Sequence, residues 1–193
     1  MKILLIGGHI SPLLAVLEEL KKHDSVHVEF VSRRHTMEGD KTPSQESKIL
    51  ETFGYPIHFV KTGRLQRNFS PHTLLSLLKV PFGFLQAFRI LSEVKPGIVV
   101  SFGSYLSVPV VIAAWLQKIP VITHEQSVHA GLASKINALF AKRVLVSWEN
   151  SLQYFPKGKT VVTGNPIRKE IFQTKAESKE IAQFLSQATL PIL

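Results

Sequence analysis

Runs of β-forming residues alternate with helix-like segments along most of this chain, and no other feature constrains its fold as strongly. The β-type runs are residues 2–6, 26–32, 57–60, 98–102, 121–123, 143–147 and 160–162. Strands that alternate with helices at this spacing form βαβ units, which build a mainly parallel sheet with helices on both faces. The sequence therefore predicts an α/β fold with a sheet of about seven strands.

Helices are expected between these runs. Their residues are 12–22, 47–53, 69–91, 107–117 and 131–140. Ser11 is the expected N-cap of the first helix, with Pro12 at its first position. Pro81 and Gly83 interrupt the third, which we expect to form two helices, and residues 33–46 are expected to form a polar loop.

Residues 96–117 carry no charge over 22 positions, which is long enough to span a bilayer. Gly97, Gly103 and Pro109 interrupt this stretch, and its β-rich first half gives way to an alanine-containing second half. Because backbone polar groups must be satisfied inside lipid, a strand, a loop and a helix fit better than a membrane span. The apolar run before Gly7 is too short for the core of a signal peptide.

Composition narrows the class of protein. A chain of 193 residues with 45% hydrophobic residues fits one ordinary domain plus a tail, and it excludes disordered and fibrous classes. The absence of cysteine excludes disulfides, thiolate metal sites and thiol catalysis, and it agrees with a reducing compartment. The eight histidines form no HExxH motif, so we expect neither a metal nor another cofactor.

Positive charge concentrates in residues 61–95, where six cations face Glu93 alone, a net charge of +5. Such a region suits nucleic acid, an anionic membrane or a phosphorylated substrate. Its aromatic residues cluster with leucines instead of interleaving with cations, which makes nucleic acid the weakest of the three. This region has more apolar side chains than one buried helix face can hold. They form either a patch that rests on a membrane or an ordinary helix pair that covers the sheet.

Two short glycine loops, Gly7-Gly8-His9 and Gly103-Ser104-Tyr105, follow β-type runs and lead into helices. In open α/β sheets, ligands bind beyond the carboxyl ends of the strands, where helix N-termini present N–H groups to oxyanions. The loops therefore predict an anion-binding crevice. A double glycine is weaker than a GxGxxG fingerprint, and no acidic residue clearly ends the second strand, so a dinucleotide-dependent dehydrogenase is disfavoured.

Three side chains near these loops have two interpretations each. His9 can act as a base near neutral pH or donate to a phosphate, or it can cap its loop. Tyr105 can bond a sugar or a phosphate, or it can simply pack. Glu125, in the polar run 123–127, can orient a sugar hydroxyl or a histidine, or it can cap the helix that begins near Gly131.

Five motifs taken together are similar to the amino-terminal half of the MurG family. They are Gly7-Gly8-His9, Ser101–Tyr105, His124–Gln126, Ala141–Val144 and Thr163–Arg168, and the resemblance covers about residues 1–170. The family comprises bacterial enzymes of peptidoglycan synthesis that transfer GlcNAc from UDP-GlcNAc to undecaprenyl-pyrophosphoryl-muramyl-pentapeptide. The resemblance implies the Rossmann-like amino-terminal half of a GT-B glycosyltransferase, with an acceptor-binding domain at 1–166. Residues 167–193 would form a linker and the start of a donor-binding domain.

The resemblance also implies a set of site residues. His9 would be the base of a metal-independent inverting reaction, with Tyr105 and Glu125 positioning the acceptor and Arg168 near the donor diphosphate. The assigned residues are His9 and Glu125 for catalysis; Gly7, Gly8, Gly103, Ser104, Tyr105, Gln126 and Ser127 for the acceptor; and Asn165 and Arg168 for the donor. The expected membrane patch is Phe69, Leu75, Leu78, Lys79, Phe82 and Phe84.

The implied partners are UDP-GlcNAc, a polyprenyl-pyrophosphate-linked acceptor, an anionic membrane surface and, for a split enzyme, a separate donor-binding chain, but not nucleic acid. The implied location is the cytoplasm, peripheral on the inner face of the plasma membrane.

The chain departs from the family pattern in three places. Its first loop is shorter than the usual GGTGGH, Ser104 stands where a second glycine is usual, and Ser127 replaces an asparagine. The donor-binding domain is missing, since Ile192-Leu193 falls where its first strand would begin. These departures suggest a shortened chain, a split gene or half of a larger enzyme, inactive alone. The alternative is a non-catalytic module that binds a lipid pyrophosphate or docks on a membrane.

Overall fold

The computed structural model describes residues 1–34, 44–61 and 71–173. These residues contain a seven-stranded sheet in the order β3-β2-β1-β4-β5-β6-β7, in which every neighbouring pair is parallel. The strands are β1 (Lys2–Ile6), β2 (His27–Ser32), β3 (Ile57–Phe59), β4 (Ile98–Ser101), β5 (Val121–Glu125), β6 (Arg143–Val146) and β7 (Thr160–Val162). The predicted α/β class and strand number are therefore confirmed.

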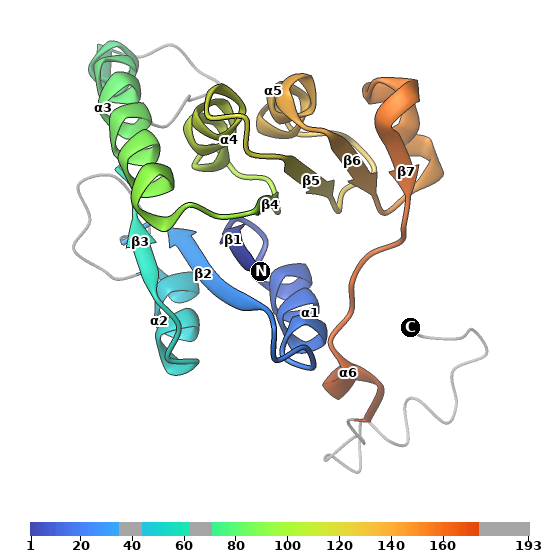
Figure 1. Cartoon of the computed structure of the whole chain (residues 1–193). Coiled ribbons are helices and arrows are strands. Elements are labelled where there is room, and N and C mark those ends of the chain that lie inside the picture. The colour runs from blue at the N-terminus through green and yellow to red at the C-terminus, as the bar shows by residue number, and fades with distance from the viewer. Residues whose placement is uncertain (35–43, 62–70, 174–193) are drawn as a thin grey trace, which may run out of the picture.

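Helices cover both faces of the sheet (Figure 1). The helices are α1 (Ile10–Leu20), α2 (Gln45–Thr52), α3 (Pro71–Val94), α4 (Ser107–Leu116), α5 (Leu132–Phe140) and α6 (Lys169–Gln173), with 3-10 turns η1 (Glu149–Tyr154) and η2 (Lys157–Lys159). Figure 1 shows α1 and α2 on one face and α3, α4 and α5 on the other.

The core is divided between these two faces. Because side chains of a strand alternate in direction, β1 contributes Leu4 and Ile6 to the cluster under α3, α4 and α5. Its other residues, Ile3 and Leu5, pack with Leu13 of α1. Burial on both faces accounts for the apolar run that opens the chain.

The strand order places the two glycine loops together. β2 and β4 flank β1 on opposite sides. The chain therefore adds strands outward from β1 first in one direction, to β2 and β3, and then in the other, from β4 to β7. Ligands in open parallel sheets bind at such a switch point, outside the carboxyl ends of the strands. The loops that follow β1 and β4 both lie there.

Several of the expected boundaries are wrong by two residues or more. Helix α1 begins at Ile10 with His9 at its N-cap position, so Ser11 and Pro12 lie within its first turn. Ser44 is the N-cap of α2, and its Oγ accepts a hydrogen bond from the Ser47 amide at 3.0 Å, so this helix begins earlier than predicted. β5 continues to Glu125, two residues beyond its predicted end.

The prediction of two helices around Pro81 is also wrong, since α3 runs unbroken from Pro71 to Val94. A proline inside a helix removes one backbone donor but has a helical φ, and Pro81 lies in an exposed position of α3. Gly83 and Ala87 lie one turn apart on the buried face of the helix.

Residues 96–117 form β4, a loop and α4, as expected. Within the described ranges, no helix combines the length and the apolar character that crossing a bilayer requires.

Candidate functional site at the carboxyl edge of the sheet

The two glycine loops touch through their backbones. A Cβ on Gly8 would lie 2.6 Å from the Gly103 carbonyl oxygen and 2.9 Å from that of Phe102. Gly103 has a φ of +81° and the following Ser104 a φ of +72°, a left-handed conformation that favours glycine. This backbone explains why a second glycine would suit the position of Ser104.

His9 lies where the two loops meet. Its ring edge packs against Gly103, and the Gln126 Nε2 donates to its Nδ1 at 2.7 Å. Burial lowers the pKa of His9, and the nearby Glu125 carboxylate partly opposes this effect. The ring is therefore neutral near pH 7, as a proton acceptor must be.

Glu125 is buried at the end of β5, with 4% of its surface exposed. Its Oε1 accepts from the Ser127 amide at 2.9 Å and its Oε2 from the Gly131 amide at 3.2 Å. Gly131 is the N-cap residue of α5, so Glu125 braces the loop that carries Gln126 and joins it to this helix. Ser127 itself is exposed.

His124 connects β5 to the segment after β7. Its Nε2 lies 3.3 Å from the Gly164 carbonyl oxygen and 3.3 Å from Ser147 Oγ. Burial lowers the pKa of His124, against an opposing effect of the Gly164 carbonyl. Although His124 belongs to a family-like motif, the sequence alone gave it no such contact.

A buried carboxyl group at the first loop was missed. Glu46 of α2 is 8% exposed, and its Oε1 accepts from Ser32 Oγ, at the end of β2, at 3.1 Å. The carboxyl lies on the Cα of Gly7, where it fills the space that a side chain would take. Burial raises the pKa of Glu46, while the Ser32 hydrogen bond and Arg33 lower it. An acidic group therefore does stand beside the end of β2, supplied by the next helix.

Arg33 follows β2 directly and reaches the second loop. Its Nη1 donates to the Tyr105 hydroxyl at 3.4 Å, and its Cζ lies 5.9 Å from the centre of the Tyr105 ring. Its Nε is buried and has no hydrogen-bond partner among the described residues.

A polar network supports the second loop from α5. Asn137 Nδ2 donates to Ser107 Oγ at 2.7 Å and to Ser101 Oγ at 3.3 Å. The Gly103 amide in turn donates to Ser101 Oγ at 3.3 Å. Asn137 is fully buried and was not predicted, because its partners lie at least 30 residues away in the chain.

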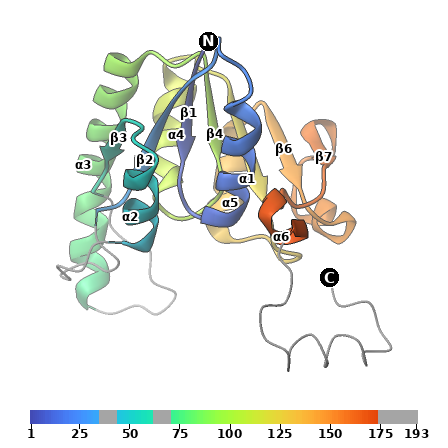
Figure 2. The same ribbon diagram turned by 90° about the horizontal axis from the view of Figure 1, so that it is seen from below.

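The two residues assigned to the donor lie on the segment after β7. Asn165 is exposed, and Arg168 Nη1 lies 3.5 Å from Glu170 Oε2. This segment crosses the edge of the sheet to α6, which lies beside α1 (Figures 1 and 2).

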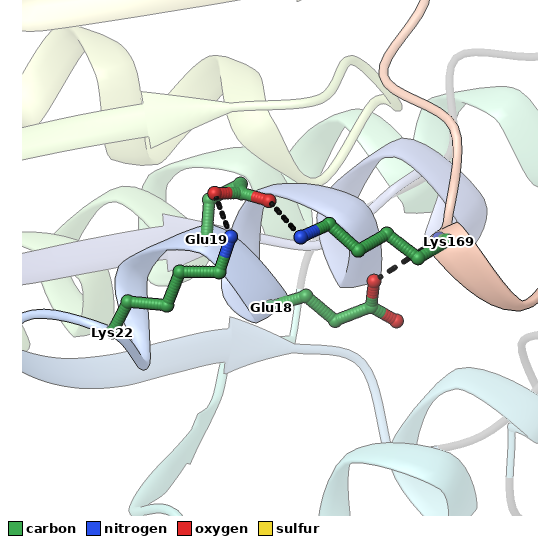
Figure 3. Close-up of polar contacts among 4 residues, drawn as sticks. All are labelled: Glu18, Glu19, Lys22 and Lys169. Atoms are coloured by element: carbon green, nitrogen blue, oxygen red, sulfur yellow. Dashed lines mark hydrogen bonds and ion pairs between the residues drawn. The ribbon is translucent and has the colours of Figure 1, made fainter.

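Charged residues attach the segment to α1 (Figure 3). Lys169 Nζ lies 3.5 Å from Glu19 Oε1, and the Lys169 amide donates to Glu18 Oε2 at 3.4 Å. Lys22 also pairs with Glu19, and this hydrogen bond is the main cause of the lowered pKa of Glu19.

The expected membrane patch is only partly described. Phe69 lies outside the described residues, as do the side chains of Leu75, Leu78 and Lys79. Phe82 is 68% exposed, but Phe84 is partly buried and packs against the core, so its place in an exposed patch is a correction. Leu85 and Phe88 are exposed on α3, and Trp115 and Leu116 are exposed on α4.

Comparison with known proteins identifies the family. Residues 6–146 match the family model described as the glycosyltransferase family 28 N-terminal domain. The chain belongs to glycosyltransferase family 28. The matched residues span β1 to β6, including both glycine loops and His9, and the MurG resemblance is confirmed at the level of family.

Two relatives carry the name UDP-N-acetylglucosamine--N-acetylmuramyl-(pentapeptide) pyrophosphoryl-undecaprenol N-acetylglucosamine transferase. The one from Caldicellulosiruptor saccharolyticus is 40% identical over 86% of this chain and 43% of its own length. The one from Clostridium novyi is 36% identical over 100% of this chain and 52% of its own length. The chain therefore spans about half the length of the relatives it matches.

Solved structures agree on the fold. Acinetobacter baumannii MurG superimposes with a TM-score of 0.65 at 26% identity, over 88% of this chain and 47% of that protein. A UDP-GlcNAc 2-epimerase from Neisseria meningitidis gives a TM-score of 0.64 at 19% identity, over 98% of this chain and 53% of its own. The domain division at residue 166 stays a prediction, since residues 174–193 lie outside the described part.

Proposed function

We propose that this chain is the acceptor-binding and base-supplying half of a transferase that moves GlcNAc from UDP-GlcNAc to a polyprenyl-pyrophosphate-linked sugar. The observation that carries the proposal is His9, which is held by Gln126 at the junction of the glycine loops and kept neutral by burial. The names of the relatives support the reaction, and their length implies that a second domain binds most of the donor.

In the proposed reaction, His9 accepts the proton of an acceptor hydroxyl. The hydroxyl oxygen forms a bond to the anomeric carbon of GlcNAc, the bond from that carbon to the diphosphate breaks, and UDP leaves with the electron pair. General-base catalysis of this kind contributes a rate factor of about 10²–10⁴.

The Gln126 amide decides which nitrogen of His9 can act. With Gln126 Nε2 donating to Nδ1, the proton of the neutral ring resides on Nε2. Rotation of the amide by half a turn lets its oxygen accept from Nδ1–H, which frees the Nε2 lone pair for the acceptor. Glu125 acts in this scheme as a positioning residue, because it braces the Gln126 loop and counteracts the effect of burial on His9.

Gly7, Gly8, Gly103, Ser104, Tyr105 and Ser127 surround the acceptor in this proposal. Asn165 and Arg168 approach the donor diphosphate from the segment after β7. Arg168 has a buried Nε without a partner among the described residues, which an oxyanion would satisfy.

Membrane docking on the cytoplasmic leaflet completes the proposal. Phe82, Leu85 and Phe88 of α3 are exposed in the basic stretch 61–95, and Trp115 and Leu116 of α4 are exposed as well. Apolar area and cations together favour an anionic interface. Replacing Phe82 and Leu85 with serine should weaken sedimentation with phosphatidylglycerol vesicles, whereas the same change at exposed Leu152 of η1 should not.

The central test mixes this chain with the carboxyl-terminal half of the Caldicellulosiruptor saccharolyticus relative and measures GlcNAc transfer to a lipid-pyrophosphate acceptor. His9→Ala should lower transfer by about 10²–10⁴-fold. His23→Ala is the matched control, because His23 is exposed and outside the site. Equal transfer by both variants would refute the role of His9, and acceptor binding without any transfer would favour a non-catalytic binding module.

A further inference from the structure

Two of the glycine amides in the loops already donate to protein acceptors. The Gly7 amide donates to the Val31 carbonyl at 2.9 Å, and the Gly103 amide donates to Ser101 Oγ. Where the loops touch, Gly8 faces the carbonyl oxygens of Phe102 and Gly103, which repel anions. A side-chain donor at this edge would therefore add to the backbone amides that a diphosphate can meet there.

Arg33 is such a donor. It extends from the end of β2 to Tyr105 of the second loop, and so it bridges the two sides of the switch point. Only one hydrogen bond of its guanidinium is formed among the described residues, although its Nε is buried. A buried N–H without a partner costs about 1–3 kcal/mol, and a guanidinium has a rigid fork that fits phosphate oxygens.

The neighbouring Glu46 does not satisfy this group. Its carboxyl bonds to Ser32 and lies against Gly7, and no described hydrogen bond or ion pair joins it to the guanidinium. Arg33 interacts with Glu46 only through the electrostatic attraction between their charges, which lowers the pKa of Glu46. The arginine is thus held near the loops by Tyr105 and by partial charge compensation, and its buried Nε has no partner among the described residues.

We propose that Arg33 binds an oxyanion of the acceptor diphosphate and so replaces donors that the short first loop lacks. This inference rests on the proposed function. The acceptor, and not UDP, is the expected source of the diphosphate, because β2 lies on the opposite side of β1 from β5, β6 and β7, after which Arg168 follows.

The test is calorimetric titration of the full 193-residue chain with inorganic pyrophosphate. Arg33→Ala should weaken binding about tenfold or more, since a charge-assisted hydrogen bond is worth about 1.5–3 kcal/mol. Arg34→Ala is the matched control, because Arg34 is the next residue, is exposed, and lies over the Phe59 ring at 4.7 Å. This control should bind within about twofold of the unaltered chain.

Two further titrations, one with a lipid pyrophosphate and one with UDP, identify the source of the diphosphate. Undecaprenyl pyrophosphate in phosphatidylcholine vesicles should lose affinity with Arg33→Ala, whereas UDP should bind both proteins alike. If Arg33→Ala unfolds the chain by leaving Glu46 uncompensated, the double variant Arg33→Ala/Glu46→Gln removes both charges and serves in its place.

The outcomes separate the two proposals. An unaltered chain that binds pyrophosphate or the lipid, with Arg33→Ala equal to it, overturns the role of Arg33 alone. Equal losses for UDP and the lipid overturn its assignment to the acceptor. An unaltered chain that binds neither pyrophosphate nor the lipid overturns the proposed function and this inference together.

Discussion

The ends of β5 and β2 lie at the same edge of the sheet but differ in how their polar groups are satisfied. After β5, both oxygens of Glu125 accept backbone amides, and the Gln126 carbonyl accepts from Trp148 Nε1 at 2.9 Å. After β2, Arg33 has a buried nitrogen without a described partner, and Glu46 is buried with a raised pKa. The comparison teaches that the first region is satisfied by its own hydrogen bonds, whereas the second keeps a buried donor without a described partner.

Gly8→Ala should have the largest effect, because it separates the loops on which both regions depend. The new Cβ would lie 2.6 Å from the Gly103 carbonyl oxygen, and neither backbone can move freely. We expect the free energy of unfolding, measured with urea, to fall by about 3 kcal/mol, which is at the upper end of the cost of overpacking. Gly158→Ala is the control, since a Cβ there meets nothing within 4 Å. Equal stability of the two variants would show that the loops are not in contact.

Glu125→Ala should have the second largest effect and tests the region after β5 directly. It leaves the Ser127 and Gly131 amides without their acceptor, at a cost of about 2–3 kcal/mol. Thermal unfolding followed by circular dichroism measures this loss. Glu51→Ala, in an exposed position of α2, should change the melting temperature little. A melting temperature for Glu125→Ala equal to that of the control contradicts the bracing role.

Glu46→Gln should change stability in the opposite direction, by a smaller amount that depends on pH. The pKa of Glu46 is higher in the folded chain than in the unfolded one, so the fold loses stability as pH rises from the unfolded pKa to the folded pKa, and the loss is constant above it. The glutamine variant keeps an acceptor for Ser32 but cannot ionise. Its melting temperature relative to the unaltered chain should therefore rise as pH increases above about 4.3, the ordinary pKa of a glutamate, and then level off. A difference that is constant or falls with pH would contradict this assignment.

Ser104→Gly should have the smallest effect, an increase of about 1 kcal/mol in the free energy of unfolding. Ser104 has a φ of +72°, which costs a residue with a Cβ about that much and costs glycine little. Chemical unfolding should detect the gain, and the same change at Ser92, an exposed position within α3, should be destabilising. A loss of stability at Ser104 would mean that its side chain contributes more than its backbone costs.

The sequence predicted the sheet well because strands are encoded locally. Runs such as residues 98–102 are short, β-branched and bounded by Pro or Gly, and the observed β4 differs from that run by one residue. Helix starts were harder, since His9 occupies the N-cap position of α1 without a side-chain cap and overrides the Ser11-Pro12 signal. The error of two residues separated His9 from the helix, whereas His9 is the residue that directly precedes its first turn.

The site was predicted only in part, because its decisive contacts are long-range. His9 was identified from its place after two glycines, but its partner Gln126 is 117 residues away. Arg33 and Tyr105 are 72 residues apart, and Glu46 reaches Ser32 from a separate helix. No local pattern marks such pairs, so Arg33 and Glu46 were not among the predicted residues.

Helix α1 connects two parts of the molecule that the sequence keeps far apart. Its first turn follows His9, and its last turn holds Lys169 through Glu18 and Glu19 (Figure 3). Eleven residues of α-helix form a stiff rod about 16 Å long. The rod therefore gives the segment after β7 a direct mechanical connection to His9, the base of the proposed reaction.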